Sequence, residues 1–417
     1  MSISAHSMIG TPDGLKVAVT TDNASGDAFG RLRVANPATI FDSKQTHDNA
    51  PLFWDESLET GAGITAAHVV DESATTITST LNTAGKFTRQ TYQRFNYQPG
   101  KSNFILMTGI ISQSGGGTGV VRRIGQFDDK NGVFFEDDEG TMKVVVRSHV
   151  TGSPVDTKVA QADWNGDPMD GTGPSGITVD WSKTHIFMFD YEWLGVGRVR
   201  FGVNIDGATY VVHSSHHANV LTDVYMSTPN NPLRYQMETT SSSPASKMKH
   251  ICVSVMSEGG IEKVGALHSH SMGAIHLDAD AADTIYAAIG IRLKTTHIGA
   301  TVDIIGASLL AETNDDFEWM ILLNPVVAGS PVFVDHVSGS ALQMYNGVTA
   351  NTIADIDIGT SLLGGWIAAQ QTNTLEIQNA RRLGAAIDGT RDEIVLAVRP
   401  LSSNADIHAA INWRELS

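Results

Sequence analysis

Short segments in which apolar and polar residues alternate recur along most of the chain, and Gly, Asn and Asp separate them. Examples are SNFILMTGII, MKVVVRSHV, FEWMILLN and DEIVLAVRPL. This pattern of β-branched and aromatic runs is typical of antiparallel sandwiches and barrels. Helical periodicity does not persist for three turns in the sequence. The best helix candidate, Asp278–Gly290, reads equally well as the start of a strand in its second half.

Several turns can be predicted from their residue types. Asp206-Gly207 and Asn131-Gly132 suit the positive φ angles of two-residue hairpins, and Gly140 marks a similar turn in EDDEGTMKVVV. The stretch Trp164–Gly176 carries four glycines and two prolines without a strand pattern. It predicts a long surface loop, which is a usual location for recognition.

Three regions follow from these patterns. Residues 1–44 are polar and alternate weakly, so this arm buries too little apolar area to fold alone. Residues 45–260 form a first β-domain rich in aromatic residues, and residues 261–417 form a second one richer in Ala, Ile, Leu and Thr. The predicted fold class is all-β, with two antiparallel β-sandwich domains of jelly-roll type after an extended N-terminal arm. We expect residues 1–44 to be removable without unfolding these domains.

The net charge and the cysteine content exclude several classes of function. The formal net charge of −17 argues against nucleic-acid binding, which needs concentrated Lys and Arg. Cys252 is the only cysteine, so the chain forms no internal disulfide and no Cys-based metal site. We find no signal-peptide pattern at the N-terminus and no run of about 18 apolar residues, so membrane insertion is not expected.

The segment Phe187–Val203, FMFDYEWLGVGRVRFGV, holds two carboxylates among bulky apolar residues. As a hairpin with a three-residue loop, it would direct its aromatic row inward and leave Asp190 and Glu192 on the outer face. That register places Glu192 opposite Arg200. Jelly-roll glucanases place acids two residues apart on one strand, and a retaining glycosidase needs carboxyls about 5–5.5 Å apart. Arg200 would lower the pKa of Glu192, which is the wrong direction for a general acid.

Clustered histidines and acids raise the question of metal binding. The histidines occur in HSSHH and LHSHSMGAIH; they are His213, His216, His217, His268, His270 and His276. A metal site needs a third and a fourth ligand with supporting partners, so we predict no metal and no other cofactor. Calcium is an alternative for FDDKNG, EDDEG and TNDDFEW, but acids of this kind are normal at hairpin tips.

The arm contains a short alternating segment around GRLRV. Phe29, Leu32 and Val34 alternate there with Arg31 and Arg33. This pattern favours a strand that adds to the sheet edge of a neighbouring protein, and a disordered tail is the alternative. These five residues are the predicted docking residues of the arm.

A resemblance adds to this interpretation. The run DAFGRLRVANPATIFDSKQTHDNAPLFWDE, followed by RQTYQRFNYQPGKSNFILMTG, resembles a family of tailed-bacteriophage virion structural proteins. The blocks DGTGPSGITVDWSKTHIFMFDYEWLGVGRVRFG and INWREL are similar to the same family. The resemblance implies a place in the particle as a fibre, minor tail or head-decoration protein, and it brings no catalytic residues. It also implies that residues 45–260 form a concanavalin-like jelly roll of the lectin or glucanase type.

We therefore predict a structural component of a tailed-phage virion and no enzyme activity. It would be assembled in the host cytoplasm, and its arm would bind other virion proteins of the capsid, portal, tail or collar. A homo-oligomer is expected, with a trimer as the first choice. One alternative is a tail protein that binds a host surface glycan through Trp164, Asn165, Asp167 and Asp170. A second alternative is a polysaccharide-degrading glycosidase that uses Asp190 and Glu192.

Overall fold

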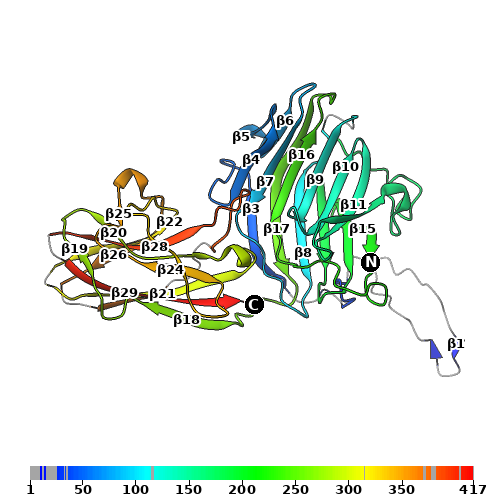
Figure 1. The fold of residues 1–417 in the computed structure, drawn as a ribbon. Helices are drawn as coiled ribbons and strands as arrows, with labels where there is room; N and C mark the ends of the chain where they lie inside the picture. Colours follow the sequence, from blue (N-terminus) through cyan, green and yellow to red (C-terminus); the bar gives the residue numbers. More distant parts are fainter. Residues whose placement is uncertain are drawn as a thin grey trace.

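The computed structural model confirms the predicted all-β class. It describes residues 10–11, 14–15, 26–31, 33, 36–113, 117–313, 315–369, 372–376, 382–402 and 405–416. The helical elements of this part are single turns: η1 (Val70–Glu72), η2 (Gln161–Asp163), η3 (Thr295–His297) and η4 (Asp355–Asp357). No described helix is long and apolar enough to cross a membrane. In Figure 1 two β-sandwiches stand side by side. The short hairpin of β1 (Gly10–Thr11) and β2 (Gly14–Leu15) precedes them.

The first domain consists of two antiparallel sheets. We call one the front sheet; its order is β12 (Val155–Ala160), β11 (Thr141–Ser148), β10 (Gly132–Asp138), β9 (Val120–Phe127), β16 (Leu233–Thr239), β7 (Gly85–Thr91) and β4 (Trp54–Gly61). We call the other the back sheet; its order is β15 (Ala208–Ser215), β14 (Val199–Ile205), β13 (His185–Tyr191), β8 (Asn103–Ile110), β17 (Ser246–Ser257), β6 (Ala74–Ser79) and β5 (Ile64–Val69). A further strand of the back sheet, β3 (Ala38–Lys44), pairs with β17. The arm as predicted, residues 1–44, thus includes a strand of this sheet.

Aromatic side chains fill the space between the front and back sheets. Phe135 of β10 is fully buried, and its ring lies 5.2 Å from that of Phe187 and 5.6 Å from that of Phe189. Phe201 of β14 contacts the same ring at 5.8 Å. The prediction that the aromatic row beginning at Phe187 faces the interior is confirmed, because alternate residues of a strand share one face.

The predicted register of this hairpin is wrong by two residues. Asp190, and not Glu192, lies opposite Arg200. The connection is longer than three residues because it folds on itself: Leu194 takes a positive φ of 36°, and the Gly197 N–H donates to the Trp193 carbonyl. An even shift leaves each side chain on its predicted face.

Two of the three predicted hairpin turns have the expected length. Asp206 and Gly207 have φ values of 51° and 80° and join β14 directly to β15. Gly140 completes a similar turn between β10 and β11. The Asn131-Gly132 turn is wider, because Phe127 pairs with Gly132 and the loop spans 128–131. There the Asp128 carboxylate accepts the backbone N–H groups of residues 130 and 131 and so stabilises the longer loop.

A buried polar network crosses the core of the first domain. Arg89 of β7 is fully buried and donates from Nε to Nδ1 of His250 at 3.0 Å. The same guanidinium donates to Gln45 at 2.9 Å and forms an ion pair with Glu56. Burial lowers the pKa of Arg89 to about 10, although Glu56 acts in the opposite direction. Burial also lowers the pKa of His250 well below its usual value, and the nearby Arg89 charge lowers it further.

The burial of His250 predicts that the free energy of unfolding of the first domain decreases in acid. The unfolded chain takes up a proton at this side chain below about pH 6.5, whereas the folded domain keeps the imidazole neutral. Stability is therefore lost as the pH falls below about 6.5, by up to about 1.4 kcal/mol per pH unit for this group. Denaturant unfolding of the first domain between pH 7.5 and 5 should show this slope. His250→Gln keeps an acceptor for Arg89 without titrating, so its slope should be shallower, and equal slopes would contradict the assignment.

The second domain is also a sandwich of two antiparallel sheets. The first has the order β18 (Ala266–Ser271), β29 (Ala405–Leu416), β21 (Thr301–Ala311) and β27 (Thr372–Glu376), with β19 (Leu277–Ala279) also paired to β29. The second has the order β23 (Val334–Asp335), β24 (Leu342–Asn346), β20 (Ile285–Leu293), β28 (Glu393–Pro400), β22 (Phe317–Leu323) and β26 (Thr360–Ile367), with β25 (Thr352–Ile353) paired to β20. The helix candidate Asp278–Gly290 is a strand end, a turn and a strand: Ala281 and Ala282 lie exposed in the turn, and the residues from Ile285 onward are buried in β20.

The two domains are in direct contact. The backbone N–H of Ala385 donates to the carbonyl of Tyr92 at 3.0 Å, and that of Ile387 donates to the Asp55 carboxylate at 2.7 Å. Elsewhere the Asn230 amide donates to the carbonyl of residue 299 at 3.0 Å. The segment that reaches the first domain lies just before β28 in the sequence and is drawn in red-orange between the domains in Figure 1.

Candidate functional site

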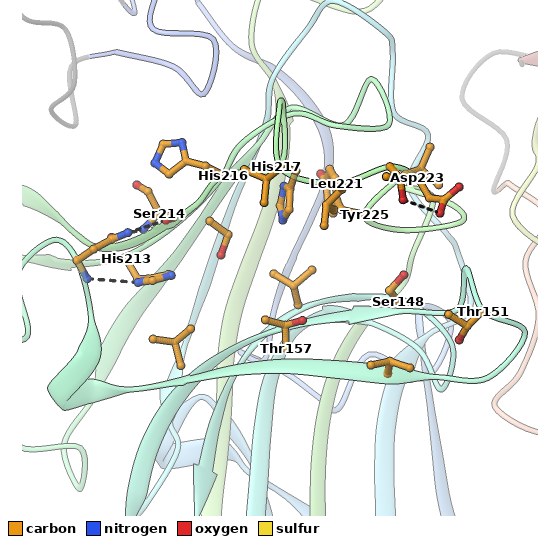
Figure 2. Close-up of a pocket in the computed structure, with 18 residues that line it drawn as sticks. Ser148, Thr151, Thr157, His213, Ser214, His216, His217, Leu221, Asp223 and Tyr225 are labelled. Carbon is orange, nitrogen blue, oxygen red and sulfur yellow. Dashed lines mark hydrogen bonds between the residues drawn. The ribbon is translucent and has the colours of Figure 1, made fainter.

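A pocket of about 590 Å³ opens at one edge of the first domain, where β12 of the front sheet faces β15 of the back sheet. Residues 213–217 and 220–225 line one side, and residues of β11, β12 and the turn between them line the other. Figure 2 shows Ser148, Thr151 and Thr157 on the wall opposite His217 and Leu221. The volume lies within the usual range of about 300–1,000 Å³ for small-molecule sites. We call this cavity the edge pocket.

The lining of the edge pocket is amphipathic. Val155, Val220 and Leu221 present apolar surface and remain exposed. Hydroxyl groups stand between them; they belong to Ser148, Thr151, Thr157, Ser215 and Thr222. Asp223 adds a carboxylate at the rim, where Thr222 donates to it at 3.3 Å. Such a wall can contact the C–H face of a small molecule and hydrogen-bond its polar edges at the same time.

His213 lines the pocket from β15 and is held in one tautomer. Its Nδ1 accepts the backbone N–H of Asn165 at 3.3 Å, so the proton is on Nε2. The Asn165 side chain in turn pairs with the backbone of Ser214, accepting its N–H at 2.8 Å and donating to its carbonyl at 2.9 Å. Burial lowers the pKa of His213, and the neighbouring His216 lowers it further. The pocket therefore presents a neutral imidazole at neutral pH.

His217 and Tyr225 form a rigid wall at the other end of the pocket. Their rings are stacked with centroids 4.1 Å apart and an angle of 9° between their planes. Nδ1 of His217 donates to the carbonyl of Gly197 at 2.6 Å, and the Tyr225 hydroxyl donates to the carbonyl of Glu192 at 2.9 Å. Burial lowers the pKa of His217. His216 points away from the cavity in Figure 2.

The sequence signalled this site only in part. The three histidines of HSSHH drew notice as metal-ligand candidates, and the structure instead places His213 and His217 in the wall of the pocket. Neither belongs to a potential metal cluster among the described residues. Tyr225 and Val155 carried no sequence signal, since only the packing of β12 against the segment after β15 brings them together.

The predicted glycan residues of the long loop occupy four different environments. Trp164 is only 6% exposed and packs in the core against Phe135, so its ring is not presented to solvent as a stacking platform. Asn165 lines the edge pocket. Asp167 is buried and accepts the N–H groups of residues 169 and 175, which fixes the loop. Asp170 is exposed and accepts from Thr172 at 2.6 Å. The pocket thus includes one of the four, and hydrogen bonding within the loop accounts for the two acids.

Asp190 does not lie on a solvated face. It is fully buried, forms ion pairs with Arg33 and Arg200, and accepts the Ser102 hydroxyl. Arg33 comes from the arm and covers this part of the back sheet. Glu192 lies beyond the end of β13, where it accepts the Arg198 N–H at 3.1 Å, and burial raises its pKa. The two acids therefore do not form the exposed pair that the glycosidase alternative requires.

The described residues of the arm contact the first domain of the same chain. Arg31 pairs with Asp27 of the arm at 2.6 Å and lies over the ring of Phe29 at 4.6 Å, and it donates to the carbonyl of Gly100 in the first domain at 3.1 Å. Arg33 pairs with Glu258 at 2.6 Å and lies over the ring of Phe104 at 4.1 Å. Leu32 and Val34, the other two predicted docking residues, lie outside the described residues.

The acidic clusters considered for calcium are paired with cations where they lie on the front sheet. Asp128 pairs with Arg94 at 2.6 Å. Glu136 is buried between Arg123 at 2.8 Å and Lys158 at 2.6 Å. These ion pairs neutralise the negative charge of the carboxylates, which a calcium ion would need for binding.

A second, shallower cavity of about 310 Å³ lies on the outer face of the front sheet. Three cations and three carboxylates line it; they are Lys86, Arg123, Arg147, Asp129, Asp156 and Glu238. Arg123 forms ion pairs with two carboxylates, that of Glu136 at 2.8 Å and that of Glu238 at 2.7 Å. The Arg234 charge lowers the pKa of Asp129 against the effect of burial. We call this cavity the outer groove.

No family model and no curated protein sequence matches the chain. Solved structures do match, over about half of it. An endo-1,3-β-glucanase from Streptomyces sioyaensis is 10% identical, covers 54% of this chain and 98% of its own, and has a TM-score of 0.37. The CBM2 module of the evolved Dit of Lactobacillus casei BL23 phage J-1 is 7% identical (54% and 98% covered, TM-score 0.35). Lectin I-B4 from Griffonia simplicifolia is 10% identical (52% and 98% covered, TM-score 0.32).

These matches correct one prediction. We expected no enzyme activity, and the matched structures include β-glucanases, so that exclusion does not stand. The matches also include lectin-like proteins and a carbohydrate-binding module of a phage protein. The resemblance to a virion structural family receives no support from a family model.

Proposed function

We propose that the first domain binds a carbohydrate in the edge pocket, as a terminal mono- or disaccharide unit of a surface glycan. The observation that carries this proposal is the amphipathic lining of an open cavity of about 590 Å³. A sugar ring has apolar C–H faces and a polar rim. The valine and leucine side chains of the pocket fit the former, and the hydroxyls with Asp223 fit the latter.

The rigidity of the wall supports the same proposal. His213 is fixed by Asn165, and His217 is fixed by Gly197 and Tyr225, so these imidazoles need little ordering when a ligand binds. A preformed site loses less conformational entropy on binding than a mobile one. The neutral Nε2–H of His213 is a donor suited to a sugar hydroxyl.

The setting we propose is a tailed-phage virion in which this chain is a structural component that also contacts host glycans. This part of the proposal rests on the resemblance of DAFGRLRVANPATIFDSKQ and the later blocks to virion proteins. It includes attachment to other virion proteins through the N-terminal arm and a homo-oligomer, with a trimer as first choice. Electron microscopy of intact particles tests it by locating the chain and counting its copies.

A glycan-binding assay tests the edge pocket. We expect the full chain to bind a subset of bacterial envelope glycans on an array, and Thr157→Val to weaken that binding by about 2- to 12-fold. The substitution keeps the shape of the side chain and removes one hydroxyl, and a hydrogen bond to a neutral group contributes about 0.5–1.5 kcal/mol. Asp223→Ala should weaken binding more, by about 10- to 100-fold, because bonds to charged groups contribute about 1.5–3 kcal/mol.

The matched control is Thr141→Val, which also removes an exposed hydroxyl. Thr141 is the first residue of β11, whereas the residues of β11 that line the pocket, Val146 and Ser148, lie near its other end. Its affinity should equal that of the unmodified chain. If all three variants bind alike, the glycan site is elsewhere in the protein. If the chain binds no glycan on the array, the proposed function is wrong.

Glycoside hydrolysis is the alternative to binding, but the outer groove does not favour it, because each of its three carboxylates is paired with an arginine, which disfavours a general acid. The same array ligands distinguish it from binding alone. Shortening of a bound glycan on incubation, with release of reducing sugar, would establish an enzyme.

A further inference from the structure

Five side chains that can bind metal gather on the outer face of the second domain, at one end of the sheet that contains β29. They are His276, Asp278, Glu312, Asp406 and His408. His276 and Asp278 come from the start of β19, Glu312 directly follows β21, and Asp406 and His408 are in β29. Because β29 lies between β19 and β21, three neighbouring strands contribute to one cluster.

The alternation of strand residues explains why these groups share a face. Leu277 and Ile407 pair with each other and are buried in the core. Asp278, Asp406 and His408 are their immediate neighbours and must point the other way. In the same manner Ala311 of β21 is buried opposite Ile407, which directs the next residue, Glu312, outward.

The distances are those of a ligand set without its ion. Glu312 Oε2 lies 3.0 Å from Nε2 of His408 and 3.3 Å from Nδ1 of His276. One ligand atom from each of these three residues lies within 4.8 Å of the other two. Ligands bound tetrahedrally at about 2.0–2.1 Å are separated by about 3.3 Å, so small side-chain movements would complete the coordination.

Asp278 adds the supporting contact that histidine ligands usually have. Its Oδ1 lies 2.8 Å from Nε2 of His276. A proton on Nε2 therefore leaves the Nδ1 lone pair directed at the side of Glu312, and a carboxylate in this position orients a metal-bound imidazole. Asp406 Oδ1 lies 3.7 Å from the same Nε2 and adds negative charge. Five ligand-type groups with three carboxylates favour a cation.

We propose that His276, Glu312 and His408 bind a divalent first-row transition-metal ion, with zinc as the best fit to two imidazoles and a carboxylate. Asp278 orients His276 through Nε2. The remaining coordination positions face solvent, since all three ligands are at least partly exposed. The ion would join β19 to β21 and β29 and so stabilise this end of the second domain.

Cobalt(II) is a suitable probe because its visible absorption reports the coordination directly. The full chain, freed of metal with a chelator, is titrated with Co²⁺ and then with Zn²⁺. We expect one equivalent of Co²⁺ to give an absorption band that Zn²⁺ abolishes. His408→Ala should lose the band, and Asp278→Asn should bind Co²⁺ about 10- to 100-fold more weakly, as expected for an orienting partner.

The matched control is His297→Ala, which removes an exposed histidine of the same domain that contacts Thr296. This variant should keep the band and the affinity. Circular dichroism in the presence of chelator shows whether each variant is folded, and His408 faces outward, so its loss should leave the metal-free fold intact. The absence of a band, or a band that His408→Ala retains, would overturn the proposal.

Discussion

Replacement of Asp190 by Ala is expected to lower the free energy of unfolding of the first domain by about 3–5 kcal/mol. The carboxylate is fully buried, and its partners are Arg200 of the paired strand and Arg33 of the arm. Removing one member of a buried ion pair leaves the other charge without compensation in a medium that solvates it poorly. Differential scanning calorimetry of the full chain should show the first-domain transition at a markedly lower temperature.

Arg31→Ala is the matched control for this prediction. Arg31 also belongs to the arm and pairs with an aspartate, but its side chain is 53% exposed. An exposed pair contributes about 0–1 kcal/mol, so this variant should unfold close to the unmodified chain. Similar small losses in both variants would show that Asp190 is not held in a buried ion pair in solution.

The sequence predicted side-chain direction well because direction depends only on local alternation. Phe187, Phe189 and Phe201 were expected to face inward, and they meet Phe135 in the core. Register was harder, because it depends on how a loop folds. The positive φ of Leu194 and the hydrogen bond from Gly197 to Trp193 lengthen the connection by an amount that residue types do not specify.

Local sequence patterns could not predict which distant segments contact one another. Asp190 and Arg33 are 157 residues apart, and no local pattern shows that an arm residue covers that strand. Burial of Trp164 follows from its contact with Phe135, also distant in the chain. The edge pocket also depends on contacts between distant segments. Val155 lies in β12 of the front sheet, whereas Leu221 lies in the segment that follows β15 of the back sheet.

The proposed metal ligands could not be found from the sequence for the same reason. His276 was noticed as part of LHSHSMGAIH, together with His268 and His270. The structure separates them: His268 stacks on Trp413, whereas His276 meets His408 at a ring distance of 5.9 Å. A histidine count in one segment could not find the partner that β29 supplies.

Removal of residues 1–44 is expected to destabilise the first domain by at least about 3 kcal/mol, contrary to the expectation from the sequence. The deletion removes β3, whose Phe41 packs on Phe95 at 5.1 Å, and loss of a buried Phe side chain alone costs about 3–5 kcal/mol. It also exposes the backbone of β17 at the positions that β3 pairs with, and it removes Arg33 from Asp190. Calorimetry of the truncated chain should show a lower first-domain transition and an unchanged second one.

The control truncation removes residues 1–25 and keeps β3, Arg33 and the contacts of residues 26–31. This chain should unfold like the full-length protein, because each contact described between the arm and the first domain involves Gly26 or a later residue. The pair of truncations therefore separates folding from assembly. Failure of the chain lacking residues 1–44 to enter particles would report on an unfolded domain. Failure of the chain lacking residues 1–25, with its domains intact, would place the docking contacts in residues 1–25 and not at the five predicted docking residues, which this chain keeps. An unchanged first-domain transition after removal of residues 1–44 would show that β3 does not stabilise the back sheet.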